Sequence, residues 1–311
     1  MEPIKDFDSF YNIKIAPQLD NLTKENKSAD IFGVLMVIGL LLTIACFIAT
    51  IIGTIESSGG FTLAVILLVL TILFIYKYTQ KEDNYTDDFK KNVIAEIVNY
   101  LQPGIIYKPE GYVSSKEYKR SSLYRGKYDY YEGDDLIQGN YKGVNFYCSE
   151  IHTYNAMRAY GSITVFKGLF FVAGTSNTYA GGTYVWPQND DQFARTLGHE
   201  HNLLPMPETI ELHLHDTEFE KYFCVCSTDP HEARTILTPE MMALLVKYRK
   251  QLKRNISFSV VKGRCYVGIP IAQDLLEPTN DPTDREEIKK HFFTVLLVLS
   301  IINQLELSRL N

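Results

Sequence analysis

Two apolar runs without a charged side chain lie near the N-terminus, at Ile31–Ile55 and Ser57–Tyr76, and only Glu56 separates them. A helix rises about 1.5 Å per residue, so about 20 apolar residues cross the roughly 30 Å hydrocarbon core of a bilayer. The first run follows a polar segment and has no small-residue cleavage site, which argues against a signal peptide. The sequence therefore predicts a transmembrane helical hairpin over residues 31–78.

The segment before the hairpin, residues 1–30, places Phe7, Phe10 and Tyr11 at spacings typical of one helix face. We interpret it as a short amphipathic segment that leads to the first span along the membrane surface and is broken at Pro17.

Basic residues flank both outer ends of the hairpin, and none lies in its connecting turn. They are Lys14, Lys24 and Lys27 before the first run and Lys77, Lys81, Lys90 and Lys91 after the second. Because lysine and arginine concentrate in cytoplasmic segments, this pattern predicts a multi-pass protein of the plasma (inner) membrane with both termini cytoplasmic. The five cysteines show no framework spacing, as expected where thiols stay reduced.

The rest of the chain predicts a stalk helix over residues 79–103 and a cytoplasmic α+β domain over residues 104–311. Extended segments joined at Lys142-Gly143 and at Lys262-Gly263 indicate hairpins of an antiparallel β-sheet, with helices packed on it. The last helix has an apolar stretch, residues 292–302, that is too short to span a bilayer and is typical of a core helix. A formal net charge of −6 argues against a nucleic-acid partner.

Two His-x-His pairs are the candidate metal ligands, namely His199 with His201 and His213 with His215. If residues 209–215 form a strand, the second pair shares one face, and Cys224 and Cys226 share a face of the next strand, which would suit a tetrahedral site. The same alternation is expected of a half-buried strand without metal, and we favour that interpretation. Known catalytic and cofactor-binding motifs are absent from the sequence, so we predict no catalytic residue, no cofactor and no metal.

A basic segment beyond the stalk is a candidate interface. Arg120, Arg125 and Lys127 alternate there with tyrosines. Such a segment near an anionic leaflet would gain about 1 kcal/mol per basic residue, and the alternative is a solvated loop.

Several ordered motifs resemble the bacterial membrane family called domain of unknown function 3137 (DUF3137). They are Gly133-Asp134-Asp135-Leu136-Ile137-Gln138-Gly139, Ser149-Glu150, Phe166-Lys167-Gly168-Leu169-Phe170-Phe171, Asp216-Thr217-Glu218-Phe219-Glu220-Lys221-Tyr222-Phe223, Ser227-Thr228-Asp229, Glu232-Ala233-Arg234 and Leu237-Thr238-Pro239. The resemblance covers roughly residues 85–307 and includes the preceding hairpin. It implies a fold and a location but no reaction, and it implies gene neighbours of the LemA type. Cys224-Val225-Cys226 departs from the family's usual strand.

Within these motifs, Asp229 is expected to cap a helix that begins at Pro230. Arg234 is either exposed or paired with Asp216, Glu218 or Glu220. The resemblance favours the pair, and Arg234 is the fourth candidate interface residue.

The function predicted from the sequence is a membrane-anchored, non-enzymatic protein whose cytoplasmic domain binds a protein partner or anionic lipid at the inner membrane surface. The expected partners are the lipid bilayer and a protein, such as a LemA-type membrane protein. The alternative is a membrane-tethered metal-dependent enzyme or metal sensor that uses the His-x-His pairs.

Overall fold

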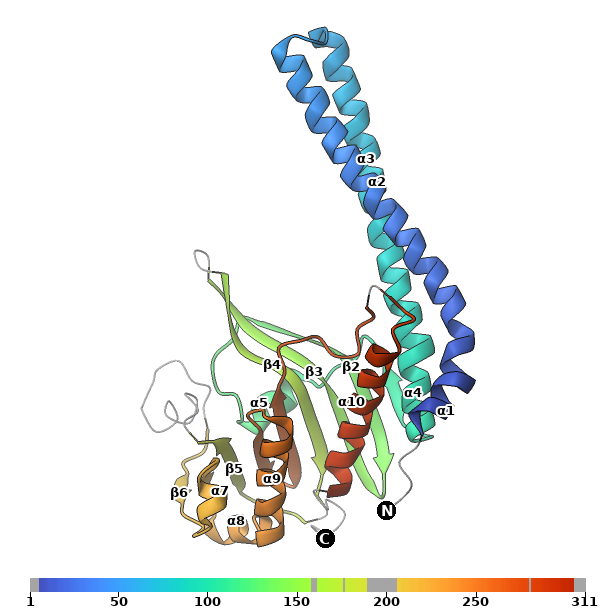
Figure 1. Cartoon of the computed structure of the whole chain (residues 1–311). Coiled ribbons are helices and arrows are strands. Elements are labelled where there is room, and N and C mark those ends of the chain that lie inside the picture. The colour runs from blue at the N-terminus through green and yellow to red at the C-terminus, as the bar shows by residue number, and fades with distance from the viewer. Residues whose placement is uncertain (1–5, 158–160, 176, 189–205, 280, 305–311) are drawn as a thin grey trace. The chain divides into compact units, whose positions relative to one another are not determined.

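The computed structural model describes residues 6–157, 161–175, 177–188, 206–279 and 281–304. The chain forms two compact units (Figure 1). The first unit contains Met1–Glu96 and Glu277–Lys290, and the second contains Ile97–Leu276 and His291–Asn311. Helices α4 (Ala95–Leu101) and α10 (Arg285–Gln304) each continue from the first unit into the second.

The first unit is a long antiparallel helical hairpin of α2 (Leu19–Ile52) and α3 (Ser57–Phe89), followed by the π-helical turn η3 (Lys90–Ile94). Gly53 ends α2 with a φ of 80°, a left-handed conformation that favours glycine. Both helices are apolar and long enough to cross a membrane, judged by length and composition. The structure thus confirms two long apolar helices near the N-terminus.

Small residues lie where α2 and α3 meet. A Cβ atom on Gly39 would come within 2.6 Å of Thr71 Oγ1, and one on Gly60 within 2.2 Å of Thr50 Oγ1. The Cys46 thiol donates to the Gly60 carbonyl at 3.5 Å. Close backbone approach through small residues is the usual way in which helices associate in lipid.

The N-terminal segment differs from its prediction. It forms α1 (Phe7–Phe10), the π-turn η1 (Tyr11–Ile15) and the 3₁₀ turn η2 (Ala16–Gln18), and then continues into α2. Pro17 does not break the helix, because it lies in the first turn of η2, where its missing N–H is not needed. Phe7, Phe10 and Ile15 are buried in the protein rather than presented to a membrane surface.

The second unit is built on an antiparallel sheet. Within the described residues, its strand order is β1-β2-β3-β4-β9-β8-β5-β7-β6. The strands are β1 (Ile106–Lys108), β2 (Tyr130–Tyr141), β3 (Val144–Met157), β4 (Gly161–Gly174), β5 (Gly182–Pro187), β6 (Ile210–Leu212), β7 (Phe223–Ser227), β8 (Ser257–Val261) and β9 (Arg264–Pro270). The predicted α+β class with an antiparallel sheet is therefore confirmed, and so are both predicted hairpin turns, at Lys142-Gly143 and Lys262-Gly263.

Helices cover both faces of the sheet. They are α5 (Ser115–Ser121), α7 (Thr217–Glu220), α8 (Pro230–Ile236), α9 (Pro239–Leu252) and the second part of α10. On one face, Leu245 and Tyr248 of α9 and Ile301 of α10 surround a small apolar gap with Val267 and Ile269 of β9. On the other face, Tyr118 of α5 packs in an aromatic core with Phe166 and Phe170 of β4. The apolar stretch of α10 is thus a core helix, as predicted.

Candidate functional site

Helix α5 carries the candidate site and was missed in the sequence analysis. Ser114 Oγ accepts a hydrogen bond from the Glu117 N–H at 3.4 Å, which caps the helix. Tyr118 and Ser121 are fully buried and hold the helix on the sheet. The signal that could have revealed α5 is Ser114-x-x-Glu117, a capping-box pattern, which local reasoning overlooked among the tyrosines.

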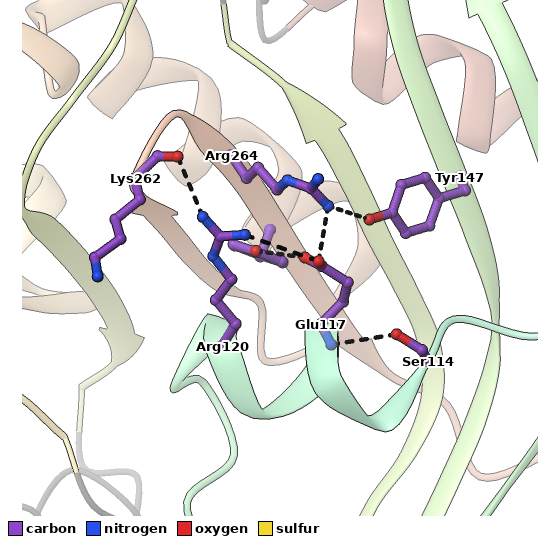
Figure 2. Close-up of polar contacts among 7 residues, drawn as sticks. Ser114, Glu117, Arg120, Tyr147, Lys262 and Arg264 are labelled. Atoms are coloured by element: carbon purple, nitrogen blue, oxygen red, sulfur yellow. Dashed lines mark hydrogen bonds and ion pairs between the residues drawn. The ribbon is translucent and has the colours of Figure 1, made fainter.

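The Glu117 carboxylate is the centre of the site (Figure 2). Its Oε1 lies 2.8 Å from Arg264 Nη1 and 3.9 Å from Arg120 Nη1. Its Oε2 accepts a hydrogen bond from the Tyr266 hydroxyl at 2.7 Å. Arg264 Nη1 also donates to the Tyr147 hydroxyl oxygen at 2.6 Å. One carboxylate is therefore shared by two guanidinium groups and a phenol.

Sheet register explains why residues far apart in the sequence meet at Glu117. Tyr147 of β3 pairs with Val172 of β4, and Val172 pairs with Tyr266 of β9, so the three side chains lie in one row across the sheet. Arg264 precedes Tyr266 by two residues and points to the same face, because side chains alternate along a strand. That face is the one that α5 covers.

The charges of the site do not cancel. Two guanidinium groups and one carboxylate leave an excess positive charge, and the Glu117 side chain is only 12 % exposed whereas those of Arg120 and Arg264 are 33 % and 38 % exposed. Burial raises the pKa of Tyr147, and the nearby Glu117 adds to this shift, so its hydroxyl keeps its proton at neutral pH. Burial and the hydrogen bond to Glu117 likewise raise the pKa of Tyr266.

Two other candidate interface residues lie apart from this carboxylate. Arg125 is half-buried near Tyr184, and burial lowers its pKa. Lys127 is exposed, and its backbone carbonyl accepts from Asn155 Nδ2 at 2.8 Å. Two tyrosines of the same segment are core residues, since Tyr118 and Tyr124 are buried. The expectation of a solvated or membrane-apposed tyrosine loop is therefore wrong for these two side chains.

Arg234 is exposed on α8 and donates to the Pro230 carbonyl at 3.4 Å. The predicted pair with a carboxylate is wrong, because the three candidate acids are used elsewhere. Asp216 accepts from the Glu218 and Phe219 N–H groups, Glu220 accepts from the Leu214 and His215 N–H groups, and Glu218 pairs with Lys221 and Lys250. The exposed position leaves Arg234 as a candidate contact residue.

The candidate metal ligands are not arranged as the strand prediction required. His199 and His201 lie outside the described residues. Strand β6 ends at Leu212, so His213 and His215 follow it in a loop, where the His213 side chain is 75 % exposed. In the described part of the chain, neither histidine belongs to a cluster of three potential metal ligands.

Cys224 and Cys226, by contrast, lie in the aromatic core. Burial raises the pKa of Cys224 to about 12 and that of Cys226 to about 11. Both thiols are therefore protonated at neutral pH, and metals bind the thiolate.

Two acidic side chains of the motifs quoted above, those of Asp229 and Glu232, accept hydrogen bonds from backbone N–H groups. Asp229 accepts from the His231 and Glu232 N–H groups at the start of α8, which is the predicted cap. Glu232 in turn accepts from the Ala180 and Gly181 N–H groups, both at 3.0 Å, and so fixes the entry to β5. These carboxylates stabilise the fold.

A comparison with family models agrees with the resemblance stated from the sequence over part of its expected extent, residues 85–307. Residues 164–307 match the family model described as "Protein of unknown function (DUF3137)". The DUF3137 region thus begins within β4 and includes all of α10, and Glu117, Arg120 and Tyr147 lie before it.

The comparisons with solved structures and with curated proteins gave one distant similarity. One solved structure, described as the crystal structure of the mycobacterial trehalose monomycolate transport factor A, TtfA, is similar at 11 % identity with a TM-score of 0.33. The similarity covers 70 % of this chain and 96 % of that one. No curated protein matches the chain.

Proposed function

We propose that this protein is a membrane-anchored, non-enzymatic binding protein, with its two apolar helices in the plasma membrane and its sheet unit on the cytoplasmic side. The sheet unit binds a protein partner, such as a LemA-type membrane protein, or anionic lipid. The observation that carries the proposal is the exposure of large apolar side chains along α2 and α3, for example Leu41 at 61 %, Ile51 at 73 % and Phe61 at 61 %.

The dimensions of these two exposed belts suit a bilayer. The first extends from Ile31 to Ile52 and the second from Phe61 to Tyr76. At about 1.5 Å per residue they measure about 33 Å and 24 Å, against a hydrocarbon core of roughly 30 Å. Contiguous apolar patches larger than a few hundred Å² are rare on soluble monomers. Lipid is the environment that would cover these side chains.

The sheet unit supports binding rather than catalysis. Four acids of the DUF3137 region accept hydrogen bonds from backbone N–H groups at helix starts and loops: Asp216, Glu220, Asp229 and Glu232. Glu218 pairs with Lys221 and Lys250. The site at Glu117 combines a carboxylate, two guanidinium groups and two phenols without a side-chain nucleophile next to a base. Such a set of side chains is suited to binding a charged group of a ligand.

The basic residues outside the apolar belts support cytoplasmic termini. A cysteine placed at Ser58, exposed in the first turn of α3, should react with an impermeant thiol reagent in intact cells, and one at Glu110, exposed in the sheet unit, should react only after permeabilisation. The parent chain is the control, since its five cysteines are buried. Labelling of the Glu110→Cys chain in intact cells would refute this topology.

The proposed protein partner is tested separately. The full chain carries an affinity tag on either terminus and is extracted from native membranes in mild detergent. A partner protein should remain bound to it when it is purified through the tag. Arg234→Ala should release it, whereas Thr235→Ala, an exposed neighbour on α8, should not. Equal recovery of the partner with both variants would remove Arg234 from the interface.

A further inference from the structure

The guanidinium groups of Arg120 and Arg264 have hydrogen-bonding capacity that the protein does not use. A guanidinium group has five N–H donors. Arg264 directs Nη1 at both the Glu117 carboxylate and the Tyr147 hydroxyl, while the Arg120 contacts are long, at 3.9 Å to Glu117 and 3.5 Å to the Lys262 carbonyl. Across the described residues, the remaining donors of both arginines make no hydrogen bond to protein, and both side chains reach solvent.

Glu117 cannot neutralise both arginines. Its Oε2 is engaged by the Tyr266 hydroxyl, so both guanidinium groups approach the single oxygen Oε1. The side chain of Lys262 points away from the two guanidinium groups in Figure 2, so its ammonium group is not counted in the charge of the site. The uncompensated charge is thus one, located between Arg120 and Arg264, and it suits an anion that carries one negative charge.

The positions of these donors are set before any ligand arrives. Tyr118 and Tyr266 are fully buried and anchor the helix and the strand that carry Glu117 and Arg264. Tyr147 accepts from Arg264 and retains its own proton, which can be donated. A preorganised site loses less side-chain entropy on binding than one formed from free arginines.

We propose that Arg120 and Arg264, with the Tyr147 hydroxyl, bind the phosphodiester group of an anionic phospholipid headgroup. Arginine suits phosphate because its fork donates two parallel hydrogen bonds to two oxygens. A phosphodiester carries a single negative charge, which matches the excess charge of the site. The assignment rests on the proposed function, because a membrane anchor raises the effective concentration of headgroups around the tethered unit.

The test uses the full chain, reconstituted in nanodiscs of phosphatidylcholine alone, and measures its co-flotation with vesicles. Vesicles that contain phosphatidylglycerol should bind it. Vesicles of phosphatidylcholine should not, because the choline ammonium group of that lipid offsets the charge of its phosphodiester. At about 1 kcal/mol per arginine near an anionic surface, Arg120→Gln and Arg264→Gln should each weaken binding about fivefold. Lys108→Gln, the same charge change at an exposed position of β1, is the matched control and should leave binding unchanged.

Further variants separate the loss of a ligand contact from misfolding and from non-specific charge. Arg120→Lys keeps the charge without the fork and should restore only part of the binding. Arg120 makes only long contacts, so its variants should unfold at the same urea concentration as the parent chain. The fluorescence of Trp186, the single tryptophan, reports this unfolding midpoint. Equal losses in Arg120→Gln, Arg264→Gln and Lys108→Gln would overturn the site, as would unchanged binding in all three.

A competition experiment with inorganic phosphate distinguishes a lipid phosphodiester from free phosphate as the ligand. Inorganic phosphate, added up to millimolar concentration, should compete only weakly with the vesicles. Tight binding of inorganic phosphate that depends on Arg264, without vesicle binding, would overturn the lipid assignment. Failure of the anchor is recognised independently, because a chain that does not insert is extracted from membranes by carbonate.

Discussion

The hairpin of α2 and α3 and the sheet unit use large hydrophobic side chains in opposite ways. On the hairpin, Leu41 and Ile51 are exposed, and the helices approach each other through Gly39 and Thr71. In the sheet unit, Phe170 and other aromatic side chains are fully buried. The difference shows that a hydrophobic run does not by itself indicate a core. Where its side chains are exposed, another apolar medium has to cover them.

The largest expected effect separates these two uses directly. Phe170→Ala should destabilise the sheet unit by about 3–5 kcal/mol, since it removes a ring that packs on Tyr118, Phe166 and Tyr266. Leu41→Ala should change that stability by no more than about 0.5 kcal/mol. Urea unfolding of the detergent-solubilised chain, followed by Trp186 fluorescence, measures both. A loss above about 1 kcal/mol for Leu41→Ala would mean that this side chain is buried in solution.

The second effect concerns Glu150, a buried acid of the sheet unit. The apolar runs of the hairpin contain no acidic residue. Burial raises the pKa of Glu150 from its ordinary value of 4.5 to about 7; Asp134 and Asp274 add to the shift, while the Leu275 N–H and Lys167 oppose it. The folded state therefore favours the protonated carboxyl. This contribution is complete below about pH 4.5 and is lost as the pH rises through 7.

Glu150→Gln, which mimics the protonated form, should accordingly be more stable than the parent chain at pH 8. The expected gain is roughly 1–3 kcal/mol, and it should vanish near pH 4.5. Glu132→Gln, in a more exposed position of β2, is the matched control. Equal pH profiles of the parent chain and Glu150→Gln would contradict the raised pKa.

A smaller effect is expected at the start of α8. Asp229→Ala should cost about 0.5–2 kcal/mol, because the His231 and Glu232 N–H groups lose their acceptor. Asp229→Ser, which retains a capping oxygen, should lose only a few tenths. If both substitutions cost the same, the cap does not contribute as the geometry indicates.

The smallest effect is expected at Arg234. Its exposure predicts that Arg234→Ala changes the stability of the sheet unit by no more than about 0.5 kcal/mol. The same Trp186 fluorescence measurement checks this. A loss of 3 kcal/mol or more would indicate that Arg234 forms a buried ion pair, contrary to its exposed position.

Much of the fold is local and was predicted from the sequence. The turns Lys142-Gly143 and Lys262-Gly263 join strands in the predicted places because both residues of each turn adopt positive φ, which short sequence signals report. The Asp229 cap was also predicted from a local signal, an Asp followed by Pro at the first helical position. Residues 209–215 misled the prediction, because the alternation of Leu212 and Leu214 continues past the end of β6.

The sequence by itself determined the apolar hairpin and the cap of α8, since helix length, charge and capping depend on neighbouring residues. The tertiary structure alone decided that Tyr118 is a core side chain and that Arg234 is exposed. It also assembled the Glu117 site, whose partners Tyr147 and Arg264 come from distant strands. Strand register and the packing of α5 bring them together, and neither depends on residues close to Glu117 in the chain.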